Sequence, residues 1–415
     1  MDLKSKQVQE FKETEIGKIC TVTSSKRIFQ ADYVKEGIPF FRSKEIIEKA
    51  QRKKISTEFF ISQDKFIEIK EKFGAPKKGD ILLSSVGARS GIPYYVIDES
   101  EFYFKDGNLI WLKEFEDIIS SQYVFLWLNS MKIFNILKNV MIGSAQPALT
   151  IEQVKKLIIQ FPSKKKQIAI VEMISSLTRQ IQNIQNQNKI LEQMAQTIFK
   201  SWFVDFDGVT EWDDSELGKI PNGWGVEKIS DVCETFGGGT PSTKNPNYWD
   251  GQNYWLAPSD LTSLNRVFCV NSKRKITDEG LQNCASKIHP ENSILMTSRA
   301  TIGVFCINKI PVATNQGFIV SKPNNPDHIY YIFLNYRNRV DEFLQNANGS
   351  TFLEISRSNF RQLPILIPTP EILDKFHVMV KLLFENIFIN EKMIEGLTKT
   401  RDVLLPKLMS GEIRV

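Results

Sequence analysis

Apolar residues between Ile170 and Trp202 recur at alternating steps of four and three, which is the heptad spacing of a coiled-coil helix. The seam positions are Ile170, Ile174, Leu177, Ile181, Ile184, Asn188, Leu191, Ala195, Ile198 and Trp202. At about 1.5 Å per residue, a helix over residues 167–203 is roughly 55 Å long, which exceeds the core of one small domain. The sequence therefore predicts a long helix that needs a partner of similar length.

A second heptad ladder near the C-terminal end of the sequence supplies that partner. Its seam positions are Leu373, Phe376, Val380, Leu383, Ile387, Asn390, Ile394, Leu397, Arg401, Leu404 and Leu408. We expect Pro406 and Gly411 to end this helix, because proline removes a backbone donor and glycine relaxes the backbone.

Each ladder carries one asparagine near its middle, Asn188 in the first and Asn390 in the second. A buried seam asparagine lowers stability but penalises every register except the one that pairs it. If the helices run antiparallel with aligned midpoints, the two amides meet and fix the coiled-coil register. The alternative is that the seam is shifted and both side chains face solvent.

The rest of the chain contains an internal repeat. Ile19-Cys20 recurs as Val232-Cys233, and Asp80–Ser85 recurs as Ser293–Ser298, each 213 positions later. Leu157–Pro162 recurs as Leu363–Pro368, 206 positions later. Because the order of these matches is kept, we expect a first domain over 1–162, a long helix over 163–206, a second domain over 207–368 and a second long helix over 369–415.

Periodicity within the first copy predicts a mixed α/β (α+β) domain. We expect strands over 81–83, 94–97, 109–112 and 157–161, an amphipathic helix over 122–140 and a short capped helix over 150–156. The predicted architecture is two such domains separated by two long helices, which form an antiparallel coiled coil with a pseudo-two-fold internal repeat.

Composition excludes several classes of protein. The chain has no run of about 18 apolar residues, so we expect no membrane span. Its polar first residues do not resemble a signal peptide, and its five cysteines show no disulfide spacing, so we expect a cytoplasmic protein. Its three histidines lie far apart, which argues against a metal site, and its net charge of +5 permits a nucleic-acid partner.

Catalytic motifs are also missing from the sequence. It contains neither a phosphate-binding GxxxxGK[ST] loop nor a nucleophile in a GxSxG context. Asn245-Pro246-Asn247-Tyr248 resembles the Asn-Pro-Pro-Tyr loop of amino-methyltransferases, and Gly237–Gly239 resembles a cofactor turn. The second proline is absent, however, and the two motifs are too close in sequence to end separate strands. We therefore expect no cofactor and no catalytic residue.

What remains is binding chemistry in the corresponding loops of the two copies. Arginine can bridge guanine O6 and N7, asparagine or glutamine can bridge adenine N6 and N7, and hydroxyls and lysines suit phosphates. The candidate DNA-binding residues are Ser24, Lys26, Arg27, Ser43, Lys44, Arg89, Ser90, Ser144 and Gln146 in the first copy, and Thr240, Ser242, Lys244, Asn245, Ser259, Arg299, Thr301, Asn315, Gln316 and Ser350 in the second. For each of them the alternative is a plain solvated loop. Similar scaffolds with different loops predict two different short sequences read by one protein.

Four stretches carry a family resemblance. They are KSWFVDF (200–206), SELGKIPNGW (215–224), GGGTPSTKNPNYW (237–249) and LLPKLMSGEIRV (404–415). Together with the repeat they resemble the specificity (S) subunit of type I restriction–modification systems, and the resemblance covers essentially the whole chain. The first copy lacks the Pro-x-Gly-Trp continuation of residues 221–224. The resemblance implies a non-catalytic subunit whose two target-recognition domains each read half of a split DNA site, spaced by the coiled coil.

The resemblance also implies partners. These are double-stranded DNA, two methyltransferase (M) subunits that use S-adenosylmethionine and dock on the helices, and a restriction and motor (R) subunit that uses ATP. Apolar residues off the seam are candidates for methyltransferase docking, since exposed apolar patches mark partner sites. They are Met194, Phe199, Phe203, Phe384 and Phe388. The alternative is that the recognition domains fold back and cover them.

Two other function classes remain open from the residues alone. One is a stand-alone DNA methyltransferase or restriction enzyme with built-in specificity, which would need a cofactor-binding sheet. The other is a coiled-coil scaffold protein with two interaction domains and no DNA partner, which steeply salt-dependent DNA binding would exclude.

Overall fold

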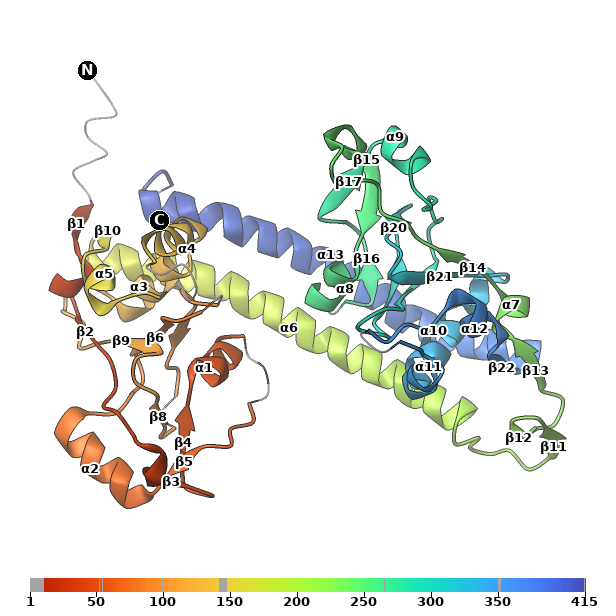
Figure 1. Cartoon of the computed structure of the whole chain (residues 1–415), viewed down its shortest axis with the longest axis horizontal. Helices are drawn as coiled ribbons and strands as arrows, with labels where there is room; N and C mark the ends of the chain where they lie inside the picture. The colour runs from red at the N-terminus through yellow and green to blue at the C-terminus, as the bar shows by residue number, and fades with distance from the viewer. Residues whose placement is uncertain are drawn as a thin grey trace. The chain divides into compact units, whose positions relative to one another are not determined.

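The computed structural model of the chain describes residues 11–51, 53, 55–87, 89–98, 100–141, 148–264, 266–349, 352–413 and 415. It divides into two compact units: the first comprises residues 1–180 and 397–415, and the second residues 181–396. Two long helices, α6 (Lys164–Phe203) and α13 (Pro370–Ser410), each contribute a segment to both units (Figure 1). In the part of the chain that the structure describes, no helix is apolar enough over a sufficient length to cross a membrane.

The described residues of the first unit form three sheets with the strand orders β2-β9-β6-β7, β3-β5-β4-β8 and β1-β10. Its strands are β1 (Lys12–Glu15), β2 (Thr21–Thr23), β3 (Tyr33–Val34), β4 (Ile38–Phe41), β5 (Phe60–Ile61), β6 (Ile81–Ser84), β7 (Pro93–Tyr95), β8 (Tyr103–Phe104), β9 (Leu109–Lys113) and β10 (Ile158–Phe161). Its shorter helices are η2 (Ile16–Lys18), η3 (Gln30–Asp32), α1 (Ser43–Ala50), α2 (Gln63–Phe73), α3 (Ser121–Leu128), α4 (Met131–Val140) and α5 (Ile151–Lys155).

The second unit repeats this plan with the sheets β14-β21-β18-β19-β16, β17-β15-β20 and β13-β22, and adds the hairpin β11-β12. Its strands are β11 (Trp212–Ser215), β12 (Gly218–Pro221), β13 (Gly225–Lys228), β14 (Cys233–Gly237), β15 (Trp249–Leu256), β16 (Phe268–Cys269), β17 (Arg274–Ile276), β18 (Ile294–Thr297), β19 (Phe305–Asn308), β20 (Ala313–Thr314), β21 (Phe318–Pro323) and β22 (Pro364–Ile367). Its shorter helices are α7 (Ile229–Val232), η4 (Pro246–Tyr248), α8 (Pro258–Leu264), α9 (Asp278–Gln282), η5 (Pro326–His328), α10 (Ile329–Asn338), α11 (Val340–Gln345) and α12 (Arg357–Gln362).

The repeat extends to single backbone hydrogen bonds. The bond from Ile16 N to Leu157 O (2.9 Å) in the first unit is matched by the bond from Ile229 N to Leu363 O (3.0 Å) in the second. The donors are 213 positions apart and the acceptors 206, which are the offsets of the sequence repeat. The mixed α/β architecture of two repeated domains with long helices, expected from the sequence, is thus confirmed.

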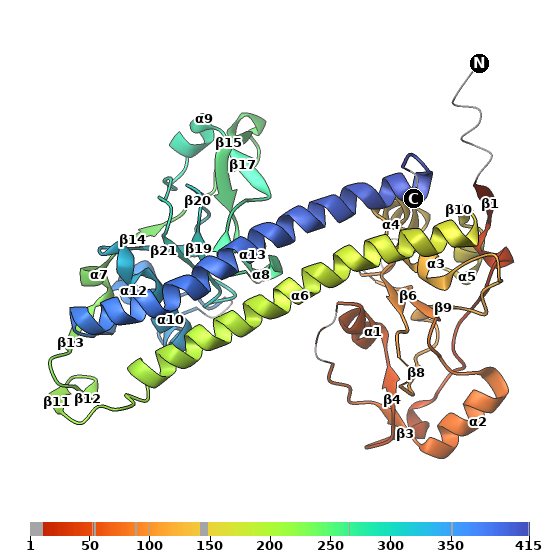
Figure 2. The ribbon, with the colours of Figure 1, turned by 180° about the vertical axis from the view of Figure 1, so that it is seen from behind.

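Within each unit the segments of α6 and α13 pack along their apolar seams. In the first unit Leu408 and Met409, near the end of α13, lie in one buried cluster with Ile170 and Ile174, near the start of α6. In the second unit Phe376, near the start of α13, contacts the rings of Trp202 and Phe203, at the end of α6. The low-numbered end of one helix therefore meets the high-numbered end of the other, which makes the pairing antiparallel. Figures 1 and 2 show the two segments of the second unit side by side from both directions.

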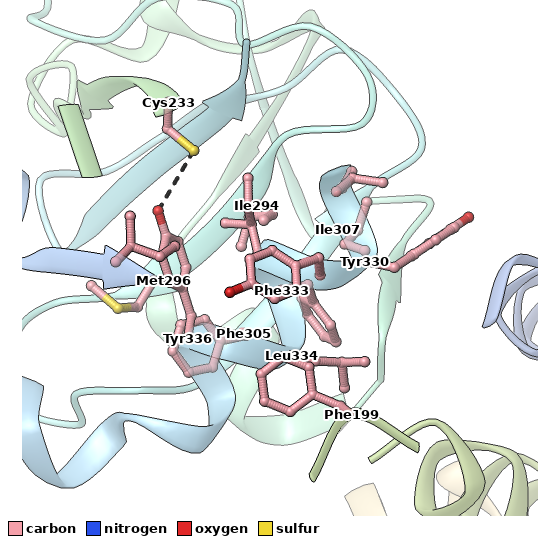
Figure 3. Close-up of a cluster of buried hydrophobic side chains, with 14 of the residues drawn as sticks. Phe199, Cys233, Ile294, Met296, Phe305, Ile307, Tyr330, Phe333, Leu334 and Tyr336 are labelled. Atoms are coloured by element: carbon pink, nitrogen blue, oxygen red, sulfur yellow. Dashed lines mark hydrogen bonds between the residues drawn. The ribbon is translucent and has the colours of Figure 1, made fainter. Parts of the chain in front are cut away.

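The core of the second unit joins its sheet to α10 and to the long helices. Figure 3 shows side chains of β18 and β19 meeting Phe333 and Tyr336 of α10, and the Tyr336 hydroxyl donates to Cys233 Sγ on β14 (3.6 Å). Phe199 of α6 belongs to the same buried cluster. The long helix is therefore part of the domain core here, not a separate stalk.

The two seam asparagines meet inside the second unit. Asn390 Nδ2 donates to Asn188 Oδ1 at 2.8 Å, and Asn188 is only 7% exposed. The contact expected from the heptads is therefore present, and the solvent-facing alternative does not apply to Asn188.

The structure corrects the predicted bounds of two helices. The helix expected over 122–140 is two helices, α3 and α4. The first ends before Asn129, and the Ser130 hydroxyl caps α4 by accepting from Ile133 N (3.4 Å). Pro406 does not end the second long helix but lies inside α13. Burial of Leu408 and Met409 offsets the backbone hydrogen bond that the proline removes, and the helix ends only before Gly411, whose φ is +75°.

The structure also corrects the expected exposure of the predicted methyltransferase-docking residues. Phe199, Phe203 and Phe384 are buried in the core of the second unit, and Phe388 is half-buried against the Phe268 ring. Of the five predicted docking residues, only Met194 is exposed. The second unit covers the other four side chains, because α6 and α13 present a face wider than a two-stranded seam to the sheet and to α10.

In each unit a buried polar side chain of one long helix, α6 in the first and α13 in the second, forms hydrogen bonds to the domain backbone. In the first unit Gln167 of α6 accepts from Ser120 N (2.8 Å) and donates to Ile118 O and Pro162 O (2.9 Å each). In the second unit Glu391 of α13 accepts from Val267 N (2.9 Å) and Phe268 N (3.1 Å). Burial raises the pKa of the Glu391 carboxyl to about 7, although these two amide hydrogen bonds act against the rise.

Replacing Asn390 by leucine should destabilise the chain. The substitution leaves the buried Asn188 amide without its partner, which costs about 1–3 kcal/mol. The double change Asn188→Leu with Asn390→Leu should recover most of this stability, because it removes both buried amides. Urea denaturation measures both free energies, and Asn186→Ala, an exposed asparagine on α6, serves as the control. If Asn390→Leu and the control lose the same free energy, the amide contact contributes nothing.

The Glu391 carboxyl should make stability depend on pH. Its folded pKa of about 7 lies above the ordinary value of 4.5, so the folded chain holds the proton more tightly, and this contribution to stability is lost as pH rises from about 4.5 to 7. The difference in unfolding free energy between wild type and Glu391→Gln should fall by roughly 2–3 kcal/mol between pH 5 and 8. Using this difference cancels His289, whose pKa is lowered by burial to about 4 and which acts in the opposite direction. A constant difference across this pH range would contradict the prediction.

Candidate nucleic-acid interface

In both units several of the predicted DNA-binding residues lie around one pair of loops. The loop after β6 and the loop before β9 are joined in the first unit by a hydrogen bond from Ser85 N to Asn108 O (3.0 Å). In the second unit the corresponding loops are joined by a bond from Ser298 N to Gly317 O (2.8 Å). The same backbone frame therefore carries two different sets of side chains.

In the first unit the frame holds Ser24, Arg27 and Ser43 against loop 105–108. Ser24 Oγ donates to Leu109 O (3.0 Å), and Ser43 Oγ donates to Asn108 O (2.7 Å). Arg27 Nε donates to Asp106 Oδ2 (3.0 Å), but the arginine side chain remains 67% exposed. The serine hydroxyls therefore shape the loop, while Arg27 has its guanidinium available to a ligand.

The cations around this frame are exposed. Lys26 and Lys44 are both exposed, and Lys44 follows Ser43 in the first turn of α1. Lys26 Nζ lies 5.1 Å from the centre of the Phe73 ring. Lys26 N donates to the hydroxyl of Tyr103, whose burial raises its pKa and keeps it neutral. The Lys26 backbone hydrogen bond and the position of Lys44 in α1 thus fix the points from which these two side chains project.

The predicted residues after β6 behave differently from one another. Arg89 is exposed, whereas Ser90 is fully buried and its hydroxyl donates to Gly87 O (2.7 Å). Ser90 is therefore corrected from a DNA-contacting residue to one that closes its own loop. Ser144 and Gln146 lie outside the described residues, as does Ser350 in the second copy.

In the second unit the frame brings Thr240, Asn315 and Gln316 together. The Thr240 hydroxyl lies 2.6 Å from Gln316 Oε1, and Asn315 Oδ1 accepts from Gly317 N (2.8 Å). Gly238 permits this approach, because a Cβ on it would lie 2.0 Å from Asn315 O. Ser259 is exposed in α8, whose Pro258 packs against Gly317.

Arg299 lies at the edge of the same frame. Its backbone bridges to Glu354, and Arg299 Nε lies 3.6 Å from Glu354 Oε2, with both side chains nearly half exposed. Thr301 follows in the same loop, is exposed, and donates through its backbone N to Arg299 O (2.8 Å). The ion pair orients the guanidinium without burying it, so the arginine can still bind a base edge or a phosphate.

Ser242, Lys244 and Asn245 form a separate group. They belong to the loop before η4 and β15, and β15, β17 and α9 lie at the end of the second unit away from α13 (Figures 1 and 2). Asn245 Oδ1 accepts from Asn247 N (3.1 Å), and Ser242 O accepts from Trp249 Nε1 (3.1 Å). The methyltransferase-like motif is therefore a capped 3-10 turn, and Lys244 is its exposed cation.

Two cations of this surface were not predicted from the sequence. Arg357, exposed at the start of α12, places its Nη1 3.8 Å from the position that a Cβ on Gly237 would occupy. Arg274 of β17 stacks 3.5 Å above the centre of the Trp249 ring. Only tertiary contacts bring Arg357 to the frame, so periodicity could not find it. The neighbouring cations Lys273 and Lys275 were the available signal for Arg274.

Among the described residues, no group of three or more histidine, cysteine, aspartate or glutamate side chains could hold a metal ion. The described surface therefore offers loops with cations, amides and hydroxyls over a rigid backbone frame. That set can bind phosphates and base edges.

Comparison with known proteins also finds two similar copies in this chain. The family model described as the type I restriction modification DNA specificity domain matches residues 8–193 and again 221–397. The MjaIX specificity subunit of Methanocaldococcus jannaschii, a type I restriction enzyme subunit, is 30% identical over 348 residues, covering 81% of this chain and 78% of that protein. The HindI specificity subunit of Haemophilus influenzae is 25% identical over 405 residues, covering 82% and 87%.

A solved structure shares the fold. The crystal structure of the type I restriction–modification S subunit from M. genitalium matches with a TM-score of 0.57 and 14% identity over 96% of both chains. Because the specificity-domain model matches both copies of the repeat and the M. jannaschii relative is similar over most of both proteins, the chain belongs to the family of type I restriction–modification specificity subunits.

Proposed function

We propose that the chain is the DNA-reading subunit of a type I restriction–modification complex and that each unit reads one half of a bipartite site. The observation that carries this proposal is the shared loop frame. The frame is held by equivalent hydrogen bonds, Ser85 to Asn108 and Ser298 to Gly317, but it displays Arg27 with Asp106 in one unit and Thr240 with Gln316 in the other. Equal frames with unequal side chains suit two different half-sites.

The proposed division of labour assigns recognition to residues 1–162 and 207–368, and spacing to the helical segments 163–206 and 369–415. The residues proposed to contact DNA are Lys26, Arg27, Lys44, Arg89, Thr240, Lys244, Ser259, Arg299, Thr301 and Gln316, to which Arg274 and Arg357 are added. Asn188 and Asn390 would set the register of the helices, because a shift would separate their 2.8 Å contact.

We further propose that methyltransferase subunits dock on an apolar stripe of α13 in the second unit, in place of the buried aromatics. Val378, Leu382, Ile389 and Met393 are 70, 65, 54 and 50% exposed. At 3.6 residues per turn they occupy about one sixth of the helix circumference, opposite its buried seam. A helix that is apolar on two opposite faces needs a second partner. Two methyltransferase subunits, with restriction and motor subunits joining through them, complete the proposed assembly.

The test of the proposed function is to map methylated adenines in DNA exposed to the chain together with its methyltransferase subunit. Methylation confined to a split sequence of two short halves is the expected result. Methylation without sequence preference would refute DNA reading by this chain. Absence of salt-dependent binding to duplex DNA would favour the scaffold alternative.

Loop substitutions should separate reading from general affinity. Arg299→Ala should relax preference in the second half-site, and Arg89→Ala in the first, by about 1–3 kcal/mol at the affected base pair. Lys44→Ala and Lys244→Ala should instead weaken binding to every sequence about equally and lower the salt slope by about 1. Competition binding at several salt concentrations distinguishes these patterns. Full sequence preference in both arginine variants would contradict their assignment as readers.

The apolar stripe predicts a docking defect without a folding defect. Leu382→Asp combined with Ile389→Asp should reduce co-purification of the methyltransferase subunit at least ten-fold, because two charges would be desolvated at the interface. Thermal unfolding of the isolated chain should not change, since both side chains are exposed. Lys381→Asp, at an exposed neighbouring position of α13, is the matched control. Normal co-purification of the double variant would rule out this stripe as the docking face.

A further inference from the structure

The loop between Asn348 and Glu354 carries an exposed aromatic side chain at the edge of the second unit's frame. Phe352 is 60% exposed, and neither a ring contact nor a buried cluster includes it among the described residues. Leaving a phenylalanine in water forgoes about 1.5–3 kcal/mol of burial free energy. The exposed ring is therefore available to a ligand.

The described residues on either side of Phe352 are held by backbone hydrogen bonds. Asn348 and Glu354 exchange two backbone hydrogen bonds of 2.9 and 2.8 Å, and Ala300 N donates to Leu353 O (3.0 Å). Ile355 N then donates to Ser298 O (3.0 Å), and Ile355 is buried in the core. The backbone directly after the exposed ring is thus held in place.

Gly349 lies close to the backbone of Phe352. Its φ is +128°, a conformation that L side chains rarely adopt, and a Cβ on it would lie 2.2 Å from Phe352 O. A side chain at position 349 would therefore clash with the backbone of Phe352. Glu354, two residues after Phe352, bridges to Arg299.

The neighbours of Phe352 are groups that suit DNA. The Arg299–Glu354 ion pair (3.6 Å) is half exposed and lies on the strand-like bridge that begins two residues after the ring. In the repeat, the 206-residue offset aligns Phe352 with Gln146 of the first copy. The sequence of the first copy therefore has a glutamine at the position where the second copy has an apolar ring beside an arginine.

We propose that Phe352 is a specificity-determining residue of the second unit and that its ring packs against the 5-methyl group of a thymine in the second half-site, beside the base pair contacted by Arg299. Apolar side chains distinguish thymine through this methyl group, which is the only apolar feature among the base edges of the major groove. The inference rests on the proposed function, because it names a base contact of the same surface.

The test replaces thymine by deoxyuridine, which removes the methyl group and keeps every hydrogen-bonding group. The chain is assembled with its methyltransferase subunit and bound to duplexes in which each thymine of the second half-site is replaced in turn. Wild type should lose about three- to ten-fold in affinity at one position, the factor expected for one buried methyl group. Phe352→Ala should bind the thymine duplex as weakly as wild type binds that deoxyuridine duplex, and should not respond to the replacement.

Two further variants complete the design. Phe352→Leu keeps an apolar side chain and should retain part of the thymine preference. Leu217→Ala truncates another exposed apolar residue, on the β11-β12 hairpin, and should behave as wild type. All variants should have the wild-type melting temperature, because the truncated side chains are exposed.

Three results would overturn the inference. In the first, Phe352→Ala responds to deoxyuridine as wild type does. In the second, the variant loses affinity equally for all sequences, or loses it at a site where wild type does not distinguish thymine from deoxyuridine, as a wedge between base pairs would. In the third, wild type itself binds without sequence preference, which would refute the proposed function together with this inference. The first two leave the proposed function intact.

Discussion

The apolar seam between α6 and α13 is the interaction on which both units depend. In the first unit it adds Leu408 and Met409 to a core that otherwise comes from residues before Gln180. In the second it continues into the domain core through Phe199, Phe203 and Phe376. Most of the stabilisation of such long helices comes from tertiary packing, because helix propensity alone is weak. Neither helix is therefore an independent rod, and each unit is completed by segments of both.

Two sets of polar contacts fix the register of the helices and their position against the domains. The Asn188–Asn390 hydrogen bond rewards a single register, because any shift would bury two amides without partners. Gln167 and Glu391 tie backbone amides of the domains to the helices with short hydrogen bonds. Apolar contacts are tolerant of sliding, whereas these hydrogen bonds are not. The register and the position of the helices within each unit thus rest on few polar residues.

The fold was largely predictable because its signals are periodic. The heptads located α6 within three residues of its start, and the offsets of 213 and 206 recur in equivalent hydrogen bonds such as Ile16 to Leu157 and Ile229 to Leu363. Errors arose where tertiary packing overrode a local rule. Pro406 lies inside a helix because residues beyond it are buried, and Phe199 and Phe384 are core residues because α10 packs against them. A helical wheel shows which residues share a face, but it does not show what lies against that face.

The candidate interface was predictable only in part, for a related reason. Exposed cations such as Arg27 and Lys244 stand out in a loop sequence, whereas burial of Ser90 and the approach of Arg357 to Gly237 depend on contacts between segments far apart in the chain. Loops that read DNA have no periodicity, so their residues can be named from composition but not ordered in space. Specificity is therefore the property of this chain that its sequence pattern reveals least.

The discontinuity of the first unit has a consequence for the synthesis of the chain. Its domain is made first, but the helical segment that buries its last apolar surface, with Leu408 and Met409, follows the whole of residues 181–396. At about 5–20 residues per second, translation delays that closure by tens of seconds. The second unit is continuous and can complete itself earlier. A ribosome that stops before the final helical turns would thus release a chain with one finished unit and one with an open apolar face, which marks the incomplete product for chaperones and proteases.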